Sequence, residues 1–373
     1  MCGIIGIVGK ADAAPLLLDG LKRLEYRGYD SAGIATLVDG VIDRRRAEGK
    51  IKNLNALIDT QPLPGTIGIG HTRWATHGLP TETNAHPHAD ERVVLVHNGI
   101  IENFQELRQE LSEAGRVFHS ETDTEAVVHL ISSYLEDGKS PAEAVAAALK
   151  RLEGAFALAI LFAGHDGLMI AARRGSPLAI GYGEGEMYIG SDALALAPLT
   201  QQICYLEEGD WAEISSAGAV IHDETDAVIE RTVQQTSTSG AMIGKGNFPH
   251  FMLKEIYEQP AVIGDTLQTI LNPWNEVITL PEMPFDLTKI PRITIVACGT
   301  SFHAGLVARY WFETIAGIPA EIDIASEFRY RNIEMQQGGL SLFISQSGET
   351  ADTLAALRYA KVQGQHIVSV VNV

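Results

Sequence analysis

The secondary-structure pattern changes part-way along the chain, and this change constrains the fold more than any other feature. Up to about residue 232, short β-rich runs alternate irregularly with amphipathic helices, and from Gly154 onward strand follows strand. This pattern is typical of a mixed α+β domain. From Arg292 onward, strands and helices alternate regularly, which is typical of a doubly wound α/β domain with a parallel sheet. The sequence therefore predicts two domains of different fold classes.

The segment between the two patterns is predicted to be a linker. Residues 233–249 show no periodicity and are rich in Gln, Ser, Thr and Gly. We expect a first domain over 1–232 and a second over 250–373, with α/β alternation clear from about residue 292. The chain stops at Val373 directly after a predicted strand, whereas a parallel sheet needs both faces covered. We therefore expect the second domain to be incomplete, as in a fragment of a longer protein.

Apolar periodicity places the helices. In the first domain it predicts helices over 13–26, 102–115, 123–138 and 140–154, and in the second over 254–267, 301–317 and 351–364. The helix from residue 140 has the strongest start signal, because Ser140, Pro141 and Glu143 supply a cap, a first-turn proline and a capping-box acid.

Charge and composition exclude several classes of partner. The net charge is −19, from 28 basic and 47 acidic residues, and opposes general binding to nucleic acids or anionic membranes. No run approaches the roughly 20 apolar residues of a membrane helix, and the N-terminus lacks a secretory pattern. Three scattered cysteines cannot form a disulfide framework. We expect a cytoplasmic protein that works on small molecules.

One of these cysteines, Cys2, follows the initiator methionine. If Met1 is removed, the first residue carries both a thiol and an α-amine, and the amine, with a pKa near about 8, can accept the thiol proton. The apolar run CGIIGIVG predicts a buried strand behind Cys2, with Gly3 allowing close approach of a substrate. Taken alone, a cysteine at position 2 is weak evidence, and an ordinary buried cysteine would be the preferred interpretation.

Polar residues cluster after two further strand-like runs, as HTRWATHG at 71–78 and HNG at 97–99. Histidines at 71, 77, 86, 88 and 97 raise the question of a zinc site. Because no helical histidine pair or acidic partner completes one, we expect structural histidines, no metal and no cofactor.

Several motifs in order resemble those of the class II glutamine amidotransferases, the N-terminal nucleophile amidohydrolases. They are CGIIGIVG, EYRGYDSAG, HTRWATHG, NAHPH, VHNGIIENF and SETDTE, and the resemblance covers about residues 1–235. It implies an α+β four-layer sandwich in which two antiparallel sheets lie between helices.

The resemblance also implies roles for individual residues. Cys2 would attack the glutamine side-chain amide with its own α-amine as base, and Asn98 with Gly99 would form the oxyanion hole. Arg73 would bind the α-carboxylate of glutamine and Asp123 its α-ammonium group. Trp74, Thr76 and His77 would belong to a loop that folds over bound glutamine. For several of these residues a purely structural role remains an alternative: a turn at Asn98–Gly99, a surface ion pair for Arg73, a packing aromatic at Trp74 and a helix N-cap at Asp123.

In the second domain, small hydroxyl residues twice occupy a predicted β-to-α turn. CGTSF follows the strand RITIVA, and QSGET follows LSLFIS. Backbone N–H groups and the helix dipole at such turns favour a phosphate, although the same residues could simply cap the helices.

This segment resembles the sugar isomerase domain, and ACGTS, ASEFRYR and SQSGETADTL match its form in the glutamine–fructose-6-phosphate aminotransferases. The resemblance implies the conversion of fructose 6-phosphate and glutamine to glucosamine 6-phosphate and glutamate, the first step of amino sugar (hexosamine) synthesis. It also implies a homodimer for the full-length enzyme. The residues expected to hold the sugar phosphate are Thr300, Ser301, Ser345, Gln346, Ser347 and Thr350.

One departure from this family is large. Its second sugar isomerase domain and C-terminal tail, which supply the imine-forming lysine, have no counterpart in these 373 residues. We therefore expect glutamine hydrolysis at most from this chain. Two alternatives remain: another class II amidotransferase, which would need a nucleotide-binding or phosphoribosyl-binding motif, or a non-catalytic sensor of phosphosugars.

Overall fold

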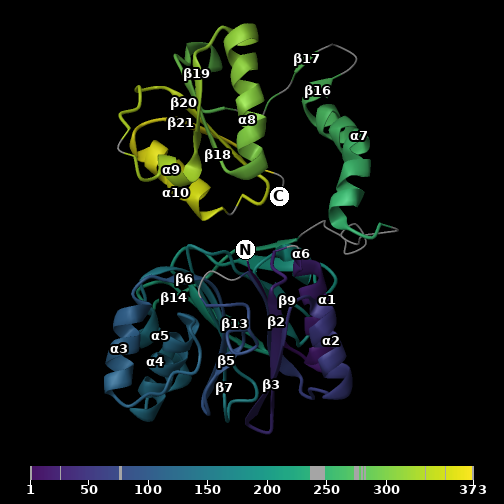
Figure 1. Cartoon of the computed structure of the whole chain (residues 1–373), viewed down its shortest axis with the longest axis vertical. Coiled ribbons are helices and arrows are strands. Elements are labelled where there is room, and N and C mark those ends of the chain that lie inside the picture. The colour runs from purple at the N-terminus through teal and green to yellow at the C-terminus, as the bar shows by residue number, and fades with distance from the viewer. Residues whose placement is uncertain are drawn as a thin grey trace. The chain divides into compact units, whose positions relative to one another are not determined.

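The structure, a computed structural model, forms two compact units, Met1–Gly244 and Lys245–Val373, each considered by itself (Figure 1). Most of the predicted linker, residues 236–247, lies outside the described part of the chain. The structure describes residues 2–25, 27–74, 78–235, 248–272, 277–278, 280, 283–331, 333–348 and 350–371.

Two antiparallel sheets form the centre of the first unit. The eight-stranded sheet has the order β15-β11-β9-β10-β1-β4-β2-β3, and the seven-stranded sheet the order β14-β13-β12-β8-β7-β6-β5. The strands of the first sheet are β1 (Gly3–Val8), β2 (Ser31–Val38), β3 (Val41–Glu48), β4 (Ile67–Arg73), β9 (Ala179–Tyr182), β10 (Met187–Gly190), β11 (Gln202–Tyr205) and β15 (Val233–Gln235). Those of the second are β5 (His88–Ala89), β6 (Val93–Ile101), β7 (Gly154–Phe162), β8 (Met169–Arg174), β12 (Trp211–Ser215), β13 (Gly218–His222) and β14 (Val228–Ile229).

Helices cover the outer face of each sheet. The helices α1 (Ala13–Leu24), α2 (Ile51–Thr60) and α6 (Ala193–Leu196) pack on the eight-stranded sheet, and α3 (Phe104–Glu113), α4 (Thr124–Glu136) and α5 (Pro141–Leu149) pack on the other (Figure 1). A third apolar cluster joins the two sheets; Ile4 and Ile69 face Val94 and Ala157 in it. Three apolar layers between four structural layers confirm the predicted four-layer sandwich.

The start signals explain which helices could be predicted. The Ser140 side chain accepts from the Glu143 backbone N–H, and Glu143 accepts from the Ser140 N–H, so the predicted capping box is present. By contrast, periodicity did not reveal α2. Only Ile51 and Leu54 of this helix are buried, and no side chain caps its start.

The second unit contains a four-stranded parallel sheet with the order β19-β18-β20-β21. The helix α8 packs on one face of this sheet, and α9 and α10 pack on the other. The predicted doubly wound arrangement is therefore confirmed for the described strands. The elements are α7 (Phe251–Ile270), β16 (Leu271–Asn272), β17 (Val277–Ile278), β18 (Ile293–Ala297), α8 (Gly299–Trp311), β19 (Ala320–Ile324), α9 (Ala325–Phe328), β20 (Leu340–Ser345), α10 (Ala351–Val362) and β21 (His366–Val371). None of the helices in the described residues is long and apolar enough to cross a membrane.

Candidate active site

Cys2 lies at the start of β1, a fully buried strand between β10 and β4. Its Sγ accepts a hydrogen bond of 3.2 Å from the backbone N–H of Trp74. Gly3 is required by its neighbours, because a Cβ would lie 2.7 Å from Thr72 Oγ1. Burial raises the pKa of the Cys2 thiol, while the Trp74 N–H lowers it. A base must therefore take the thiol proton before Cys2 can act as a nucleophile.

Asn98 and Gly99 lie inside β6, so the turn alternative for this dipeptide is wrong. They pair with Ala157 and Phe156 of β7. Gly99 has φ +125°, and a Cβ there would overlap the Ala155 carbonyl oxygen, which explains why glycine occupies this position. Asn98 Nδ2 donates to the Cys2 carbonyl oxygen at 3.2 Å. The amide of Asn98, in one sheet, therefore faces Cys2, which directly precedes β1 of the other sheet.

Asp123 occupies the N-cap position of α4, but its side chain makes no capping hydrogen bond. Instead, its Oδ2 accepts from the Ile101 backbone N–H at 2.9 Å and lies 3.8 Å from His97 Nδ1. One oxygen of the carboxylate thus binds β6, while the other accepts from the hydroxyl of Thr124, the first residue of α4, at 3.4 Å. Asp123 therefore occupies the N-cap position that the alternative predicted, but its side chain does not cap the helix.

Arg73 is the last residue of β4 and is only 3% exposed, which excludes a surface ion pair. Its guanidinium donates to the carbonyl oxygens of Leu79 and Gly78, at 3.1 and 3.2 Å. The next residue, Trp74, is 49% exposed, and its ring meets that of Tyr29 edge to face at 5.7 Å. The arginine therefore ties Gly78 and Leu79 to the end of β4.

A small pocket of about 20 Å³ brings most of the predicted glutamine-site residues together. It also contains residues that we had not assigned a role, above all Thr122 and Thr124, which flank Asp123 in the motif SETDTE. Thr76 and His77 lie outside the described residues. The lining consists of Cys2, Arg73, Trp74, His86, His97, Gly99, Thr122, Asp123 and Thr124.

Buried histidines form a cluster at this pocket, and two of them, His86 and His97, belong to its lining. The ring of His86 lies 4.2 Å from that of His71, 4.8 Å from His88 and 6.5 Å from His97. Burial lowers the pKa of His71 and of His88 to about 3, and it lowers that of His86 well below its usual value. The Thr124 hydroxyl lies 2.8 Å from His86 Nε2 and 3.1 Å from His97 Nδ1. The lowered pKa values keep the rings of His71, His86 and His88 neutral near pH 7.

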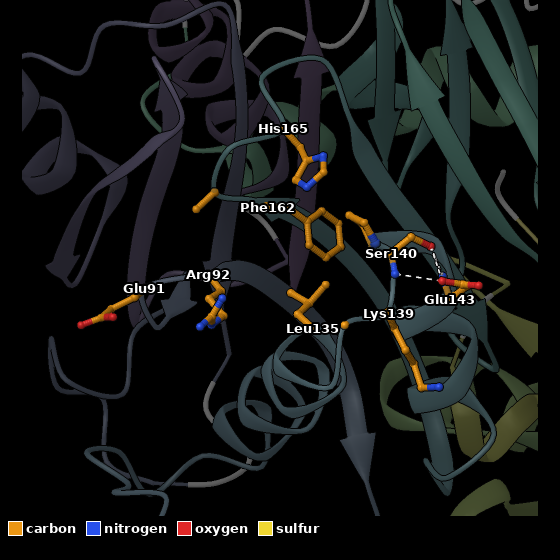
Figure 2. A pocket seen from close by; sticks show the side chains of 11 residues that line it. Glu91, Arg92, Leu135, Lys139, Ser140, Glu143, Phe162 and His165 are labelled. Carbon is orange, nitrogen blue, oxygen red and sulfur yellow. Dashed lines mark hydrogen bonds between the residues drawn. The ribbon is translucent and has the colours of Figure 1, made fainter.

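A larger cavity of about 620 Å³ lies beside the opposite end of β6 from Asn98, and its lining includes none of the predicted catalytic or binding residues (Figure 2). Its carboxylate Glu143 is engaged in the capping box with Ser140, and Arg92 pairs with Glu136 at 3.4 Å. The larger of these two cavities is therefore not the one that contains Cys2.

In the second unit, the predicted phosphate-binding residues follow β18 and β20 at the carboxyl edge of the sheet. Ala297 and Ile344 are paired in register, so the segments that follow β18 and β20 leave the sheet side by side. This is the point at which the strand order reverses, where ligands of open α/β sheets bind. Ser345 Oγ accepts from the Gly348 N–H at 3.1 Å and lies 3.5 Å from Thr350 Oγ1.

The two hydroxyl-rich segments differ in their backbone. Thr300 and Ser301 already belong to the first turn of α8, which begins at Gly299, two residues earlier than we predicted. In the other segment, Thr350 occupies the N-cap position of α10 without a side-chain capping bond, and Gln346 is exposed. The Thr350 side chain therefore does not cap α10, contrary to the capping alternative.

Two family models match the chain. A glutamine amidotransferase domain matches residues 71–198, which include Arg73, Asn98 and Asp123, and a SIS domain matches residues 286–373. The chain joins a glutamine amidotransferase domain to a SIS domain. These are the two domain families that the motifs indicated.

The most similar curated proteins listed carry one name. The chain is 61% identical over all its 373 residues to glutamine–fructose-6-phosphate aminotransferase [isomerizing] of Zymomonas mobilis, and 59% identical to the protein of that name from Bradyrhizobium diazoefficiens. The resemblance to this family is confirmed. The chain spans 61% and 62% of the length of these two relatives.

Solved structures agree on the fold. Glutamine phosphoribosylpyrophosphate amidotransferase from B. subtilis matches with a TM-score of 0.55 at 18% identity, over 100% of this chain and 81% of the other. At this identity the match shows a shared fold and no more.

Proposed function

We propose that the amidotransferase domain hydrolyses glutamine to glutamate and ammonia with Cys2 as the nucleophile. The observation that carries the proposal is the single pocket in which Cys2, Arg73, Gly99 and Asp123 meet. A thiol, a guanidinium and a carboxylate around one cavity are the groups that a free amino acid with a side-chain amide requires.

The proposed reaction uses these groups in sequence. After removal of Met1, the α-amine of Cys2 takes the thiol proton, and Sγ attacks the amide carbon of glutamine. The Asn98 side-chain amide and the Gly99 backbone N–H stabilise the negative oxygen of the tetrahedral intermediate. The amide nitrogen leaves as ammonia with that proton, and water then cleaves the thioester to give glutamate. Arg73 binds the α-carboxylate throughout, and Asp123 binds the α-ammonium group.

We expect Arg73→Lys to raise the KM for glutamine by roughly 10- to 100-fold, with kcat changed less than about threefold. Lysine keeps the positive charge but loses the bidentate geometry, and a charge-assisted hydrogen bond contributes about 1.5–3 kcal/mol. Lysine is preferable to alanine because Arg73 also holds the Gly78 and Leu79 carbonyls. The measurement is glutamate release against glutamine concentration.

The matched control is Arg23→Lys, at a surface pair with Asp19 in α1, which should leave both constants unchanged. An unchanged KM in Arg73→Lys would exclude the carboxylate-binding role. If the unmodified chain with a free Cys2 amine releases no glutamate, the non-catalytic alternative is favoured instead.

For the whole protein to which this chain corresponds, we propose the activity named for its relatives, the transfer of glutamine nitrogen to fructose 6-phosphate to give glucosamine 6-phosphate. The SIS domain would hold the sugar phosphate with Thr300, Ser301, Ser345, Gln346, Ser347 and Thr350. Support comes from the 61% identity and from the two hydroxyl-rich segments at the strand-order reversal. We further propose a cytoplasmic homodimer that requires neither metal nor cofactor.

We expect the double variant Ser347→Ala/Thr350→Val to weaken the binding of fructose 6-phosphate by about tenfold or more. Each lost hydrogen bond to a charged phosphate costs about 1.5–3 kcal/mol. Isothermal titration calorimetry measures the dissociation constants. Thr288→Ala, at an exposed hydroxyl that donates to Asp286, is the control. Equal affinity in the double variant, or equal affinity of the protein for unphosphorylated fructose, would contradict this assignment.

A further inference from the structure

A buried histidine, His71, contacts the side chain of Asn98. His71 lies in β4, is 0% exposed, and pairs with Ile4 of β1 on one side and Gly33 of β2 on the other. Its Nε2 lies 3.0 Å from the His97 carbonyl oxygen and 3.1 Å from Asn98 Oδ1. The central position of β4 in the sheet fixes the backbone from which this ring projects.

The partners of His71 determine its tautomer. A carbonyl oxygen can only accept, so Nε2 must carry the proton that the His97 carbonyl receives. Among the described residues, Nδ1 has no hydrogen-bond partner. Burial lowers the pKa of His71 to about 3, so the ring remains a neutral donor at Nε2 across the pH range in which glutamine is hydrolysed.

This tautomer in turn fixes the amide of Asn98. One end of the amide faces the Nε2–H of His71 and the other faces the Cys2 carbonyl oxygen at 3.2 Å. If the amide were rotated by 180°, its NH₂ group would face a donor and its oxygen would face an acceptor. Both hydrogen bonds would then be lost in a buried site, where an unsatisfied polar group is costly.

We infer that His71 is a positioning residue for glutamine hydrolysis: its Nε2–H holds the Asn98 side chain so that Nδ2, the oxyanion-hole donor, faces Cys2. The inference rests on the proposed function, because it concerns how the oxyanion hole of that reaction is oriented. His71 itself reaches no reacting atom and acts through Asn98. Preorganised donors lower the barrier because no reorientation is needed when the negative charge develops.

A double-mutant cycle between His71 and Asn98 tests this inference in the 373-residue chain. We expect Asn98→Ala alone to lower kcat about 100- to 1,000-fold, as expected for the loss of one oxyanion donor. His71→Leu, which removes the donor at similar volume, should lower kcat about 10- to 100-fold with KM changed less than about threefold. In the Asn98→Ala background, adding His71→Leu should lower kcat by less than about threefold further, because the side chain that His71 positions is already absent.

Two further variants separate positioning from structure. His71→Gln, whose amide can still donate, should recover most of the lost kcat. Thr72→Val is the control: it replaces a buried side chain at the next position of β4 and should leave kcat unchanged. If His71 had only a structural role, His71→Leu would lower kcat by the same factor in both backgrounds, and the His71→Gln variant would not recover activity. Either result overturns the inference.

A crystal structure of His71→Leu provides a test that does not depend on turnover. We expect the Asn98 amide to rotate or to adopt more than one orientation. If Asn98 Nδ2 stays within hydrogen-bond distance of the Cys2 carbonyl in one ordered conformer, His71 does not hold it. If the unsubstituted chain does not hydrolyse glutamine, the proposed function fails, and the crystal structure still decides the link between His71 and Asn98.

Discussion

Replacing Cys2 with alanine is expected to abolish glutamine hydrolysis, with kcat reduced on the order of 10⁴-fold or more. The pocket contains no second thiol among its lining residues, and the remaining groups can only orient glutamine and stabilise the oxyanion. Glutamine should still bind, because Arg73 and Asp123 remain. The measurement is glutamate release by a preparation in which mass spectrometry has confirmed the mature N-terminus.

Cys2→Ser refines the same test. A hydroxyl is a weaker nucleophile than a thiol when the base is an amine, so a small residual rate is expected. Cys298→Ala removes a thiol from the other unit and should leave hydrolysis unchanged. Full activity of Cys2→Ala would end the proposed mechanism.

Acidification below about pH 6.5 is expected to destabilise the amidotransferase domain steeply. In the folded state, burial lowers the pKa values of His71 and His88 to about 3, and that of His86 also lies well below its usual value. In the unfolded chain each histidine binds a proton near pH 6.5. The unfolded state therefore gains protons that the folded state cannot take up. The stabilisation is fully present above pH 6.5 and is lost as the pH falls toward 3.

The expected size is about 1.4 kcal/mol of unfolding free energy per pH unit for each histidine, or about 4 kcal/mol per unit for all three. Urea unfolding monitored by tryptophan fluorescence between about pH 7 and pH 5 measures this change in unfolding free energy. This pH range lies above that in which ordinary carboxylates titrate. His88→Gln retains a partner for the Thr122 hydroxyl, which lies 3.1 Å from His88 Nε2. This variant should reduce the slope by about one third. A slope identical to that of the unsubstituted chain would show that His88 takes up its proton in the folded state.

Local sequence signals predicted the elements well where one signal was strong. Periodicity and the Ser140–Glu143 capping box located α5, whereas α2, with two buried apolar residues and no cap, was missed. The turn alternative for Asn98–Gly99 was wrong because it rests on a dipeptide preference. Pairing of β6 with β7 decides the conformation of these two residues, and that pairing is a long-range contact.

The candidate site was predictable only in part for the same reason. The motif order indicated Cys2, Arg73 and Asp123 as partners, and the pocket brings them together. The tie between His71 and Asn98 joins β4 of one sheet to β6 of the other, and no sequence spacing encodes this contact. The sequence also did not predict side-chain orientation: Asp123 occupies a cap position, yet its carboxylate accepts a hydrogen bond from the Ile101 N–H.

The volume of the pocket has a consequence for rate and affinity. A cavity of about 20 Å³ holds little more than one water molecule, and glutamine is many times larger. The substrate must therefore displace lining side chains, so the measured affinity for glutamine is the intrinsic affinity reduced by the free energy of opening. Cys2 Sγ accepts a hydrogen bond from the Trp74 N–H, and Trp74 lines the same pocket. A rearrangement of the lining that admits glutamine therefore also changes the surroundings of the thiol, so substrate binding and the reactivity of Cys2 are coupled.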